Sequence, residues 1–490
     1  MNEIEDILIK KGPMLSNELK KELISRINIE DYNARQRISR AIKNGKIRSF
    51  KNISFNNNVS FVYLESHKNR KDFIKILKEK MKEEAKSYFY ILRSIENKID
   101  INRLPIYSNS TVKPLKGHRM FKDLINKLKL ENIIIEKNES NQVYYQLKHK
   151  TDENNNIIKK VTAINKIEEI IIKDVFGFLS KINFVAYDKL KINSEFYKFK
   201  WSFTTPSYIL PMKKYIKEQL QPGFIIGDIL LKNVIYKEDI LYFIDKINIL
   251  KNQKNISKFA PFYIGYNFEK AAFNELKKNG VIIINIQQFF SKKYYETLKN
   301  IFEIFIGAYE MLKENPEKII KLFEKLEKLE GEMNNIKGES FELIPAYYLS
   351  IHTNYNNFEL NKTIKYEGKE KEIDLKAINN NNEIKIIECK ATRYEIDIDY
   401  TEKWIKENIP LINKWLKNQD FYRNKKIIHE IWSTGGFSED SLKLLRERKE
   451  STKKYQINYY DYNDMYDLFE KDKKLREILY DNYSVEKYVK

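Results

Sequence analysis

Two neighbouring stretches near the C-terminus decide the fold: KEIDLKAI at 371–378 and EIKIIECK at 383–390. Both have the apolar pattern of β-strands, and an asparagine-rich turn joins them. Because alternate residues of a strand face the same side, Glu388 and Lys390 project together. Asp374 precedes Glu388 by 14 residues, the length of a strand, a turn and a returning strand. We therefore expect Asp374 to lie beside them across the strand pair.

The surrounding residues predict an α/β domain over 336–490. A helix is expected to begin near Ser340, and a three-stranded meander follows it. A long amphipathic helix, a further buried strand and a helix capped by Ser438 come next, giving the order α-β-β-β-α-β-α. The tail after about residue 455 carries no readable motif. The segments are GESFELIPAYYLSIH, FELNKTIKYEG, KEIDLKAI, EIKIIECKAT, IDYTEKWIKENIPLINKWLKNQ, KIIHEIWSTGG and SEDSLKLLRE.

Two carboxylates and a lysine on neighbouring strands suit hydrolysis of a phosphodiester bond. Asp374 and Glu388 can hold one or two Mg²⁺ (or Mn²⁺) ions through oxygen atoms, and the metal lowers the pKa of its bound water. Lys390 can orient that water or stabilise the developing charge. The main-chain carbonyl of Cys389 is a further expected metal ligand. Glu342, on the preceding helix, can reach the same end of the sheet.

This pattern, I-D-L-K-A, a turn and I-I-E-C-K, resembles the PD-(D/E)XK nuclease superfamily, which has a restriction-endonuclease-like fold. The preceding G-E-S-F-E segment resembles the helix that carries an additional acidic ligand in many members. The resemblance covers about residues 336–450. It implies that Asp374 and Glu388 are metal ligands. It also implies that Lys390 is the catalytic lysine and Glu342 the helix acid.

The sequence departs from the family pattern at two places. Ile373 stands where the family name has proline. Pro345 lies in the expected first helix and leaves the register of that helix open. The helix acid is therefore Glu342 or, one turn earlier on a similar face, Glu339.

The E-x-K triplet alone is a weak signal in a chain so rich in lysine and glutamate, because residues 275–277 and 383–385 match it as well. Only Glu388 and Lys390 lie inside a buried apolar strand, where solitary charges are costly. The alternative interpretation is a structural ion pair between strands, such as Glu388 with Lys376.

Residues 1–67 have the order helix, helix, basic helix, β-hairpin, which resembles a winged helix-turn-helix. Ser16 is expected to cap the second helix and Asp31 the third, which Gly45 ends. The hairpin, the wing, is expected over residues 47–64. In such folds the third helix enters the major groove of DNA, and the alternative is a winged helix that contacts protein. The expected DNA-binding residues are Arg35, Arg37, Arg40, Lys43 and Arg48.

Residues 68–150 are expected to form a helical or second winged-helix-like domain, followed by the linker TDENNN at 151–156. Its expected elements are a long helix over 73–95, a helix within 117–130 and a hairpin over 131–147.

An α/β domain is expected over 157–310, with parallel strands because a helix separates the last two. It loosely resembles a degenerate nuclease-like core with Asp228 on one strand but no E-x-K strand. TTPSYILP at 204–211 is expected to be a structural loop, with a ligand-binding loop as the alternative, and 316–335 a charged linker helix. The three strand runs are 224–231, 258–266 and 281–286.

The 490-residue chain carries 89 Lys+Arg against 69 Asp+Glu, a net charge of +20. Residues 1–150 account for +14 of this (32 basic, 18 acidic), so the first third is expected to contact a polyanion.

One cysteine excludes a disulfide scaffold and a cysteine-rich zinc site. Five scattered histidines without an HExxH pair argue against a histidine zinc enzyme. Without a signal peptide or an apolar run of membrane-spanning length, the chain is expected to be cytoplasmic.

The sequence therefore predicts a multidomain α/β and α+β protein that cleaves DNA with Mg²⁺ or Mn²⁺. Double-stranded DNA is the expected substrate, and defence against foreign DNA the expected role by analogy. A double-strand cut by one active site implies a dimer or two binding events. The expected protein partner is a second copy of the chain or a defence-system protein. One alternative is a DNA-binding regulator with an inactive nuclease-like domain, and another is an RNA-processing nuclease.

Overall fold

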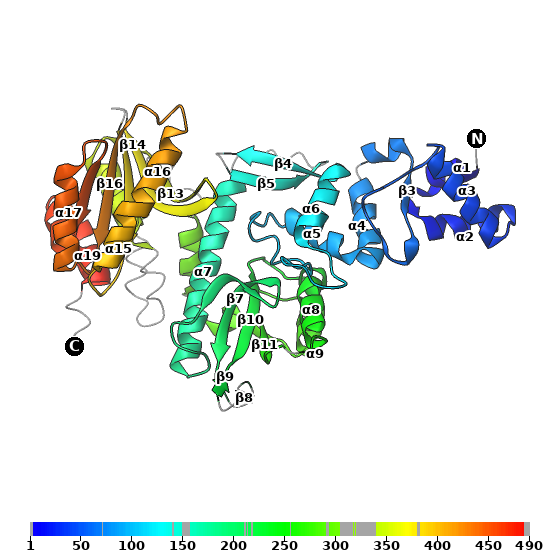
Figure 1. Ribbon diagram of the computed structural model, residues 1–490, viewed down its shortest axis with the longest axis horizontal. Coiled ribbons are helices and arrows are strands. Elements are labelled where there is room, and N and C mark those ends of the chain that lie inside the picture. Colours follow the sequence, from blue (N-terminus) through cyan, green and yellow to red (C-terminus); the bar gives the residue numbers. More distant parts are fainter. Residues whose placement is uncertain are drawn as a thin grey trace. The chain divides into compact units, whose positions relative to one another are not determined.

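A computed structural model describes residues 3–70, 72–139, 142–148, 157–209, 212, 214–216, 219–254, 256–290, 294–303, 317, 319, 340–379 and 383–484. The chain divides into two compact units. The first comprises Met1–Val161 and Phe178–Phe289, and the second comprises Thr162–Gly177 and Phe290–Lys490. Both are mixtures of helices and strands, as the sequence predicts (Figure 1).

The first unit opens with three helices and a small antiparallel sheet in the order β1-β3-β2. Its core is a cluster of aliphatic side chains that includes Leu8, Leu19, Leu23 and Ile38, each at most 4% exposed. These are the apolar faces of the three helices, so burial of one face explains why each forms. The elements are α1 (Glu3–Lys11), β1 (Met14–Leu15), α2 (Ser16–Ile27), α3 (Asp31–Lys43), β2 (Arg48–Ser49), η1 (Asn56–Asn58) and β3 (Phe61–Tyr63).

Two expected helix caps in this region are wrong. Leu15, not Ser16, is the N-cap of α2, and Glu18 accepts a hydrogen bond from the Leu15 amide at 2.8 Å. The Ser16 hydroxyl accepts from the amide of Ser60 instead, which ties α2 to the hairpin. Asp31 is the first residue of α3 rather than its cap, and it pairs with Arg35.

Gly45 ends the third helix as expected, with φ +71° and its amide donating to the Ile42 carbonyl. The expected hairpin is present, but its paired strands are much shorter than the 47–64 stretch. Phe50 lies just beyond β2 and outside the ladder, where it packs in an aromatic cluster with Phe61 of β3 and with Phe73.

Residues 65–148 continue the first unit. The helix expected over 73–95 is two helices, because the backbone turns at Ala85 (φ −149°). The turn lets Leu77 and Tyr88 bury in the same core. The elements are η2 (Glu65–Asn69), α4 (Phe73–Glu84), α5 (Lys86–Glu96), α6 (Phe121–Leu130), β4 (Ile134–Glu139) and β5 (Gln142–Leu147). The β4–β5 hairpin confirms the one expected there, and the expected linker at 151–156 lies outside the described residues.

Residues 191–289 of the first unit, here called the middle module, hold a five-stranded sheet in the order β12-β11-β10-β7-β6. β10, β11 and β12 run parallel, as predicted, while β6 and β7 are antiparallel. The stretch 204–211 is not simply a loop, because Thr204–Ser207 belong to β7, which pairs with strands on both sides. The elements of the middle module are β6 (Lys191–Phe196), β7 (Phe199–Ser207), β8 (Lys214–Ile216), β9 (Gln219–Gln221), β10 (Gly223–Leu230), α8 (Lys237–Lys251), β11 (Phe259–Gly265), α9 (Lys270–Lys278), β12 (Ile282–Asn285) and α10 (Ile286–Phe289). Helix α7 (Ile157–Lys181) precedes the module, and its residues 162–177 belong to the second unit.

The second unit contains another five-stranded sheet, in the order β13-β14-β15-β16-β17. β13, β14 and β15 form the expected antiparallel meander, and β16 and β17 join it in parallel. We call residues 340–460 the C-terminal core. The elements are α14 (Leu343–His352), β13 (Tyr355–Tyr366), β14 (Lys369–Asn379), β15 (Glu383–Lys390), α15 (Ile398–Lys403), the π-helical η3 (Trp404–Asn408), α16 (Ile409–Lys417), β16 (Lys426–Ser433), α17 (Glu439–Ser451), β17 (Gln456–Tyr460), α18 (Tyr462–Leu468) and α19 (Lys473–Tyr483).

The first helix of the C-terminal core begins at Leu343, slightly later than expected. Pro345 therefore lies in the first helical turn, where its missing N–H is not needed, so it causes no break. The predicted cap of α17 is confirmed, because the Ser438 hydroxyl accepts from the Ser441 amide at 3.3 Å. Of the expected linker helix at 316–335, only Glu317 and Ile319 are among the described residues.

Candidate functional site

The structure brings together the two carboxylates and the lysine that the sequence singled out. Lys390 Nζ lies 2.9 Å from Glu388 Oε1 and 3.9 Å from Asp374 Oδ2. The side chain of Glu388 is only 5% exposed, whereas that of Lys390 is 31% exposed. The three groups therefore form a buried acidic pair with an ammonium at its solvent side.

The strand register produces this arrangement. β14 and β15 pair Leu375 with Ile387, and one further step along the ladder sets Asp374 opposite Glu388. The amide of Cys389 donates to Asp374 Oδ2 at 2.7 Å, which fixes the orientation of that carboxylate. Asp374 thus lies beside Glu388 on the neighbouring strand, as the 14-residue spacing predicts.

Two residues that the sequence did not reveal hold Glu388 from other sides. Lys371 Nζ lies 2.9 Å from Glu388 Oε2, and the Tyr400 hydroxyl donates to Glu388 Oε1 at 2.6 Å. Lys371 belongs to β14, and Tyr400 is the third residue of α15. No local pattern marks either residue, because Lys371 approaches from the paired strand and Tyr400 from helix α15, which follows β15 in the chain.

Glu342 directly precedes α14 and is 4% exposed. Its Oε1 atom lies 3.5 Å from Lys166 Nζ, and Lys166 also contacts Glu372 at 3.2 Å. Burial, and then the charges of Asp374 and Glu342, raise the pKa of the Cys389 thiol. Glu339, the alternative helix acid, lies outside the described residues.

The electrostatics of the acidic pair are asymmetric. Burial, and then repulsion from Glu388, raise the pKa of Asp374 to about 7. Burial alone would raise the pKa of Glu388, but Lys390 and Lys371 outweigh it, so the pKa of Glu388 is lowered. Burial alone would lower the pKa of Lys390, but Glu388 and Asp374 raise it, so the ammonium stays charged at neutral pH.

Glu388 does form an ion pair between strands, as the alternative interpretation expects, but its partner on β14 is Lys371 and not Lys376. Lys376 is 1% exposed and binds Glu359 at 3.0 Å and the Tyr422 hydroxyl at 2.8 Å. The other E-x-K triplet on β15 is structural, because Glu383 pairs with Lys426 and Lys385 pairs with Glu430.

The donor set of this site suits a hard divalent cation, since carboxylate and main-chain oxygens are the ligands that Mg²⁺ prefers. Burial and repulsion from Glu388 together raise the pKa of Asp374, and a bound cation would relieve the repulsion. In the described part of the chain, no three acidic, histidine or cysteine groups stand close enough together to form a metal cluster. At the expected site, lysine ammonium groups neutralise Glu388.

The residues expected to bind DNA are exposed on α3 and β2. Arg35 pairs with Asp31 at 2.7 Å and Arg48 with Glu65 at 3.3 Å. Such exposed ion pairs contribute little to the stability of the folded chain, so these arginines can leave them to bind a phosphate group. Arg37, Arg40 and Lys43 are exposed on the same helix, so the five residues offer positive charge to solvent.

Comparison with protein families gives no matching family model, and no curated protein matches the chain. Within the described residues, no helix is both long and apolar enough to cross a membrane.

Proposed function

We propose that this protein is a metal-dependent endonuclease that hydrolyses phosphodiester bonds of DNA. The observation that carries the proposal is the meeting of Asp374, Glu388 and Lys390 on adjacent strands. Burying two carboxylates side by side is costly unless positive charge offsets it. Lys371 and Lys390 offset Glu388, and a bound cation would offset Asp374 as well. The α-β-β-β-α-β order around them is that expected of a restriction-endonuclease-like fold and supports the same reading.

Asp374 and Glu388 would hold Mg²⁺ or Mn²⁺, with the Cys389 carbonyl and Glu342 as further oxygen donors. The bound cation would supply an activated water and offset negative charge on the phosphate. Cys389 holds Asp374 in place through its amide, so this carboxylate is oriented before substrate arrives. Lys390 keeps its proton and can donate to a phosphate oxygen as its charge develops.

The N-terminal elements supply the substrate contacts in this proposal. α2, α3 and the β2–β3 hairpin follow the order of a winged helix, in which the helix equivalent to α3 enters the major groove. The charge excess of +14 in residues 1–150 favours binding to the phosphate backbone. A role in defence and a homodimeric arrangement remain proposals by analogy.

The test is cleavage of supercoiled plasmid and linear DNA in Mg²⁺, Mn²⁺ or EDTA. Wild type is compared with Asp374→Asn and Lys390→Met, with Lys369→Met as an exposed control on β14. We expect metal-dependent cutting that both site variants lose and the control keeps. DNA binding without cutting in either metal would favour a regulator with an inactive nuclease-like domain. Cutting confined to RNA in a parallel substrate panel would reassign the substrate.

A further inference from the structure

The two five-stranded sheets of this chain have the same topology. In each, the first three strands are antiparallel and the last two are parallel additions, and a helical segment precedes each added strand. In the middle module the strands are β6, β7, β10, β11 and β12 in sheet order. In the C-terminal core they are β13, β14, β15, β16 and β17.

The correspondence extends to single residues. β10 and β15 are both eight residues long, and Asp228 and Glu388 are the sixth residue of each. One step beyond the last pair of each ladder, Ser202 stands opposite Asp228 as Asp374 stands opposite Glu388. Position for position, Leu230 then occupies the place of Lys390.

The loops beyond these strands also match. Ile235 accepts from the Glu269 amide and donates to the Asn267 carbonyl. In the C-terminal core, Ile396 accepts from the Ser438 amide and donates to the Gly436 carbonyl. Glu269 and Ser438 are the N-caps of α9 and α17, so the same hydrogen-bond pair precedes the same helix in both modules.

The groups expected to hold metal in the C-terminal core have other partners in the middle module. Asp228 binds the ammonium of Lys246 at 3.0 Å, and both side chains are fully buried. Lys246 also donates to two main-chain carbonyls, at 2.7 and 2.8 Å, and lies 3.9 Å from the centroid of a Trp201 ring. The ammonium is thus surrounded by oxygen atoms, as a metal would be.

The main-chain carbonyl at the place of Cys389 is that of Ile229. It accepts from the Tyr107 hydroxyl at 2.6 Å. Tyr107 belongs to the segment after α5, and one of the carbonyls that binds Lys246 is that of Ile106 in the same segment. Residues 97–110 therefore cover the position that corresponds to the candidate active site.

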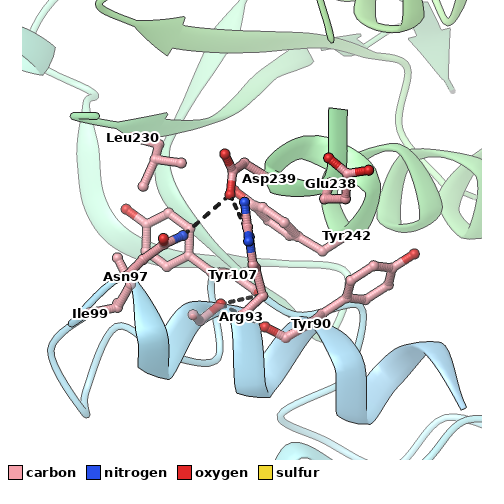
Figure 2. Close-up of a pocket in the computed structure, with 10 residues that line it drawn as sticks. Tyr90, Arg93, Asn97, Ile99, Tyr107, Leu230, Glu238, Asp239 and Tyr242 are labelled. Carbon is pink, nitrogen blue, oxygen red and sulfur yellow. Dashed lines mark hydrogen bonds and ion pairs between the residues drawn. The ribbon is translucent and has the colours of Figure 1, made fainter. Parts of the chain in front are cut away.

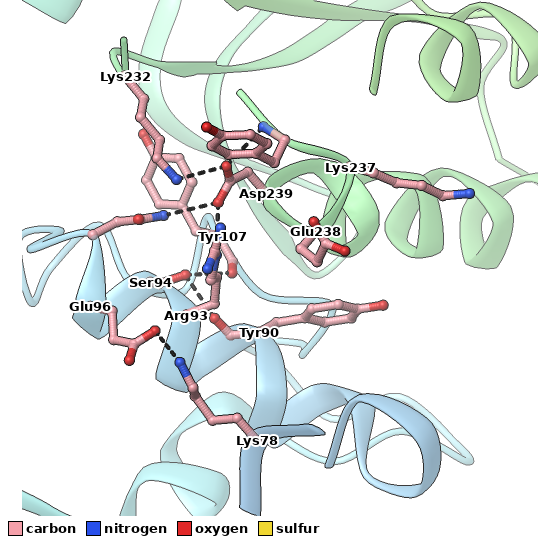
Figure 3. A network of polar contacts seen from close by, with 12 residues as sticks. Lys78, Tyr90, Arg93, Ser94, Glu96, Tyr107, Lys232, Lys237, Glu238 and Asp239 are labelled. Atoms are coloured by element: carbon pink, nitrogen blue, oxygen red, sulfur yellow. Dashed lines mark hydrogen bonds and ion pairs between the residues drawn. The ribbon is translucent and has the colours of Figure 1, made fainter. Parts of the chain in front are cut away.

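A small pocket remains beside this segment, and Figure 2 shows Arg93 of α5 reaching across it toward Asp239. Asp239 is the third residue of α8, as Tyr400 is of α15. Its carboxylate is fully buried and binds Arg93 and Lys232 at 2.8 Å each. Figure 3 shows these contacts of Asp239 together with the hydrogen bond that the Ser94 hydroxyl donates to the Tyr107 carbonyl.

We infer that the middle module is a second copy of the C-terminal core whose centre has become the docking site for α5 and residues 97–110. Lys246 occupies the position that corresponds to the metal. The Tyr107 hydroxyl binds the Ile229 carbonyl, which corresponds to the expected Cys389 ligand, and Arg93 binds α5 to Asp239. The copy therefore binds part of its own chain where the C-terminal core would bind metal and substrate.

Hydrogen–deuterium exchange on the full chain tests the docking. Arg93→Met leaves Asp239 with one counter-ion fewer, and we expect exchange of residues 97–110 to rise about tenfold or more. Arg93→Met/Asp239→Asn should regain part of the protection, because it removes both charges of the pair. The control Lys82→Met breaks the exposed pair with Glu238 and should leave exchange unchanged. Wild-type exchange in Arg93→Met would overturn the docking.

Metal titration of the full chain tests the copy. We expect Asp374→Asn to abolish Mn²⁺ binding and Asp228→Asn to leave its stoichiometry and affinity unchanged. Loss of a Mn²⁺ ion in Asp228→Asn would overturn the replacement of metal by Lys246. Wild type that binds no Mn²⁺ would contradict the proposed nuclease function instead, and the exchange experiment would still decide the docking.

Discussion

Glu388 is the most constrained side chain of the candidate site. Lys371, Lys390 and Tyr400 all contact its carboxylate. The charged and the neutral partners should have opposite effects on the affinity of the site for a metal cation. The ammonium of Lys371 occupies space and carries charge that a metal ion would have to displace. The Tyr400 hydroxyl is neutral and orients the carboxylate without repelling a cation.

Replacing Lys371 with methionine should therefore tighten Mn²⁺ binding. The pair is partly exposed on the lysine side, so a gain of about fivefold is expected, equivalent to ~1 kcal/mol for such an ion pair. Calorimetric titration measures it, with Lys369→Met as the matched control on the same strand. Weaker binding in Lys371→Met would mean that this lysine supports the metal site rather than competing with it.

Tyr400→Phe should have the opposite effect. The variant removes a buried hydrogen bond to a charged group, worth about 1.5–3 kcal/mol, so Mn²⁺ affinity should fall roughly tenfold or more. The cleavage rate at limiting metal should fall in parallel. Tyr394→Phe is the control, because Tyr394 is 82% exposed on the neighbouring loop. Equal affinities for Tyr400→Phe and wild type would remove Tyr400 from the site.

At the scale of elements, strands with continuous apolar runs were predictable from the sequence. The position of Asp374 beside Glu388 on the neighbouring strand was predictable as well. β7 was not, because its residues Ser202, Thr204 and Thr205 are polar although all three are buried in the sheet. The break at Ala85 was missed for a related reason: alanine favours helix, and only tertiary packing turns the chain there. Lys166 was beyond prediction, since it reaches Glu342 from 176 positions away in the chain.

Helix α3 carries a prediction at the same scale. Arg37→Ala/Lys43→Ala removes two exposed positive charges without touching the buried face formed by Ala34, Ile38 and Ala41. DNA affinity should fall about tenfold, and the slope of log affinity against log salt should become shallower by about 2. Fluorescence anisotropy with labelled duplex DNA across a salt series measures both. Lys10→Ala on α1 is the control, and an unchanged slope in the double variant would place the DNA contacts elsewhere.

Over the whole molecule, chemistry and charge are separated along the chain. Most of the positive excess, +14 of +20, lies in residues 1–150, whereas residues 331–490 are nearly neutral and hold the candidate catalytic residues. The two sheets share one topology but differ in the partners of their acidic residues. In the middle module the fully buried Lys246 neutralises Asp228, whereas in the C-terminal core Glu388 contacts the partly exposed ammonium of Lys390. One fold thus serves internal docking in one place and candidate chemistry in the other.

The C-terminal core should lose stability in acid because of His429. This side chain is fully buried against Asn413, and burial lowers its pKa from 6.5 to about 3. Between these values the unfolded chain binds a proton that the folded chain does not, so stability falls as pH drops below 6.5. At pH 5 the loss amounts to about 2 kcal/mol from this one group.

Urea unfolding followed by tryptophan fluorescence measures the effect, because Trp404, Trp415 and Trp432 lie in the C-terminal core and only one other tryptophan exists. Wild type is compared with His429→Gln at pH 7 and pH 5. Asp374, with its raised pKa, changes stability in the opposite sense by favouring the folded state as pH falls from about 7, but both proteins share it and the difference removes it. The gap between the two proteins should therefore shrink at pH 5 by about 2 kcal/mol, while His118→Gln should follow wild type. A gap that stays constant with pH would show that His429 is charged in the folded chain and that its burial is incomplete.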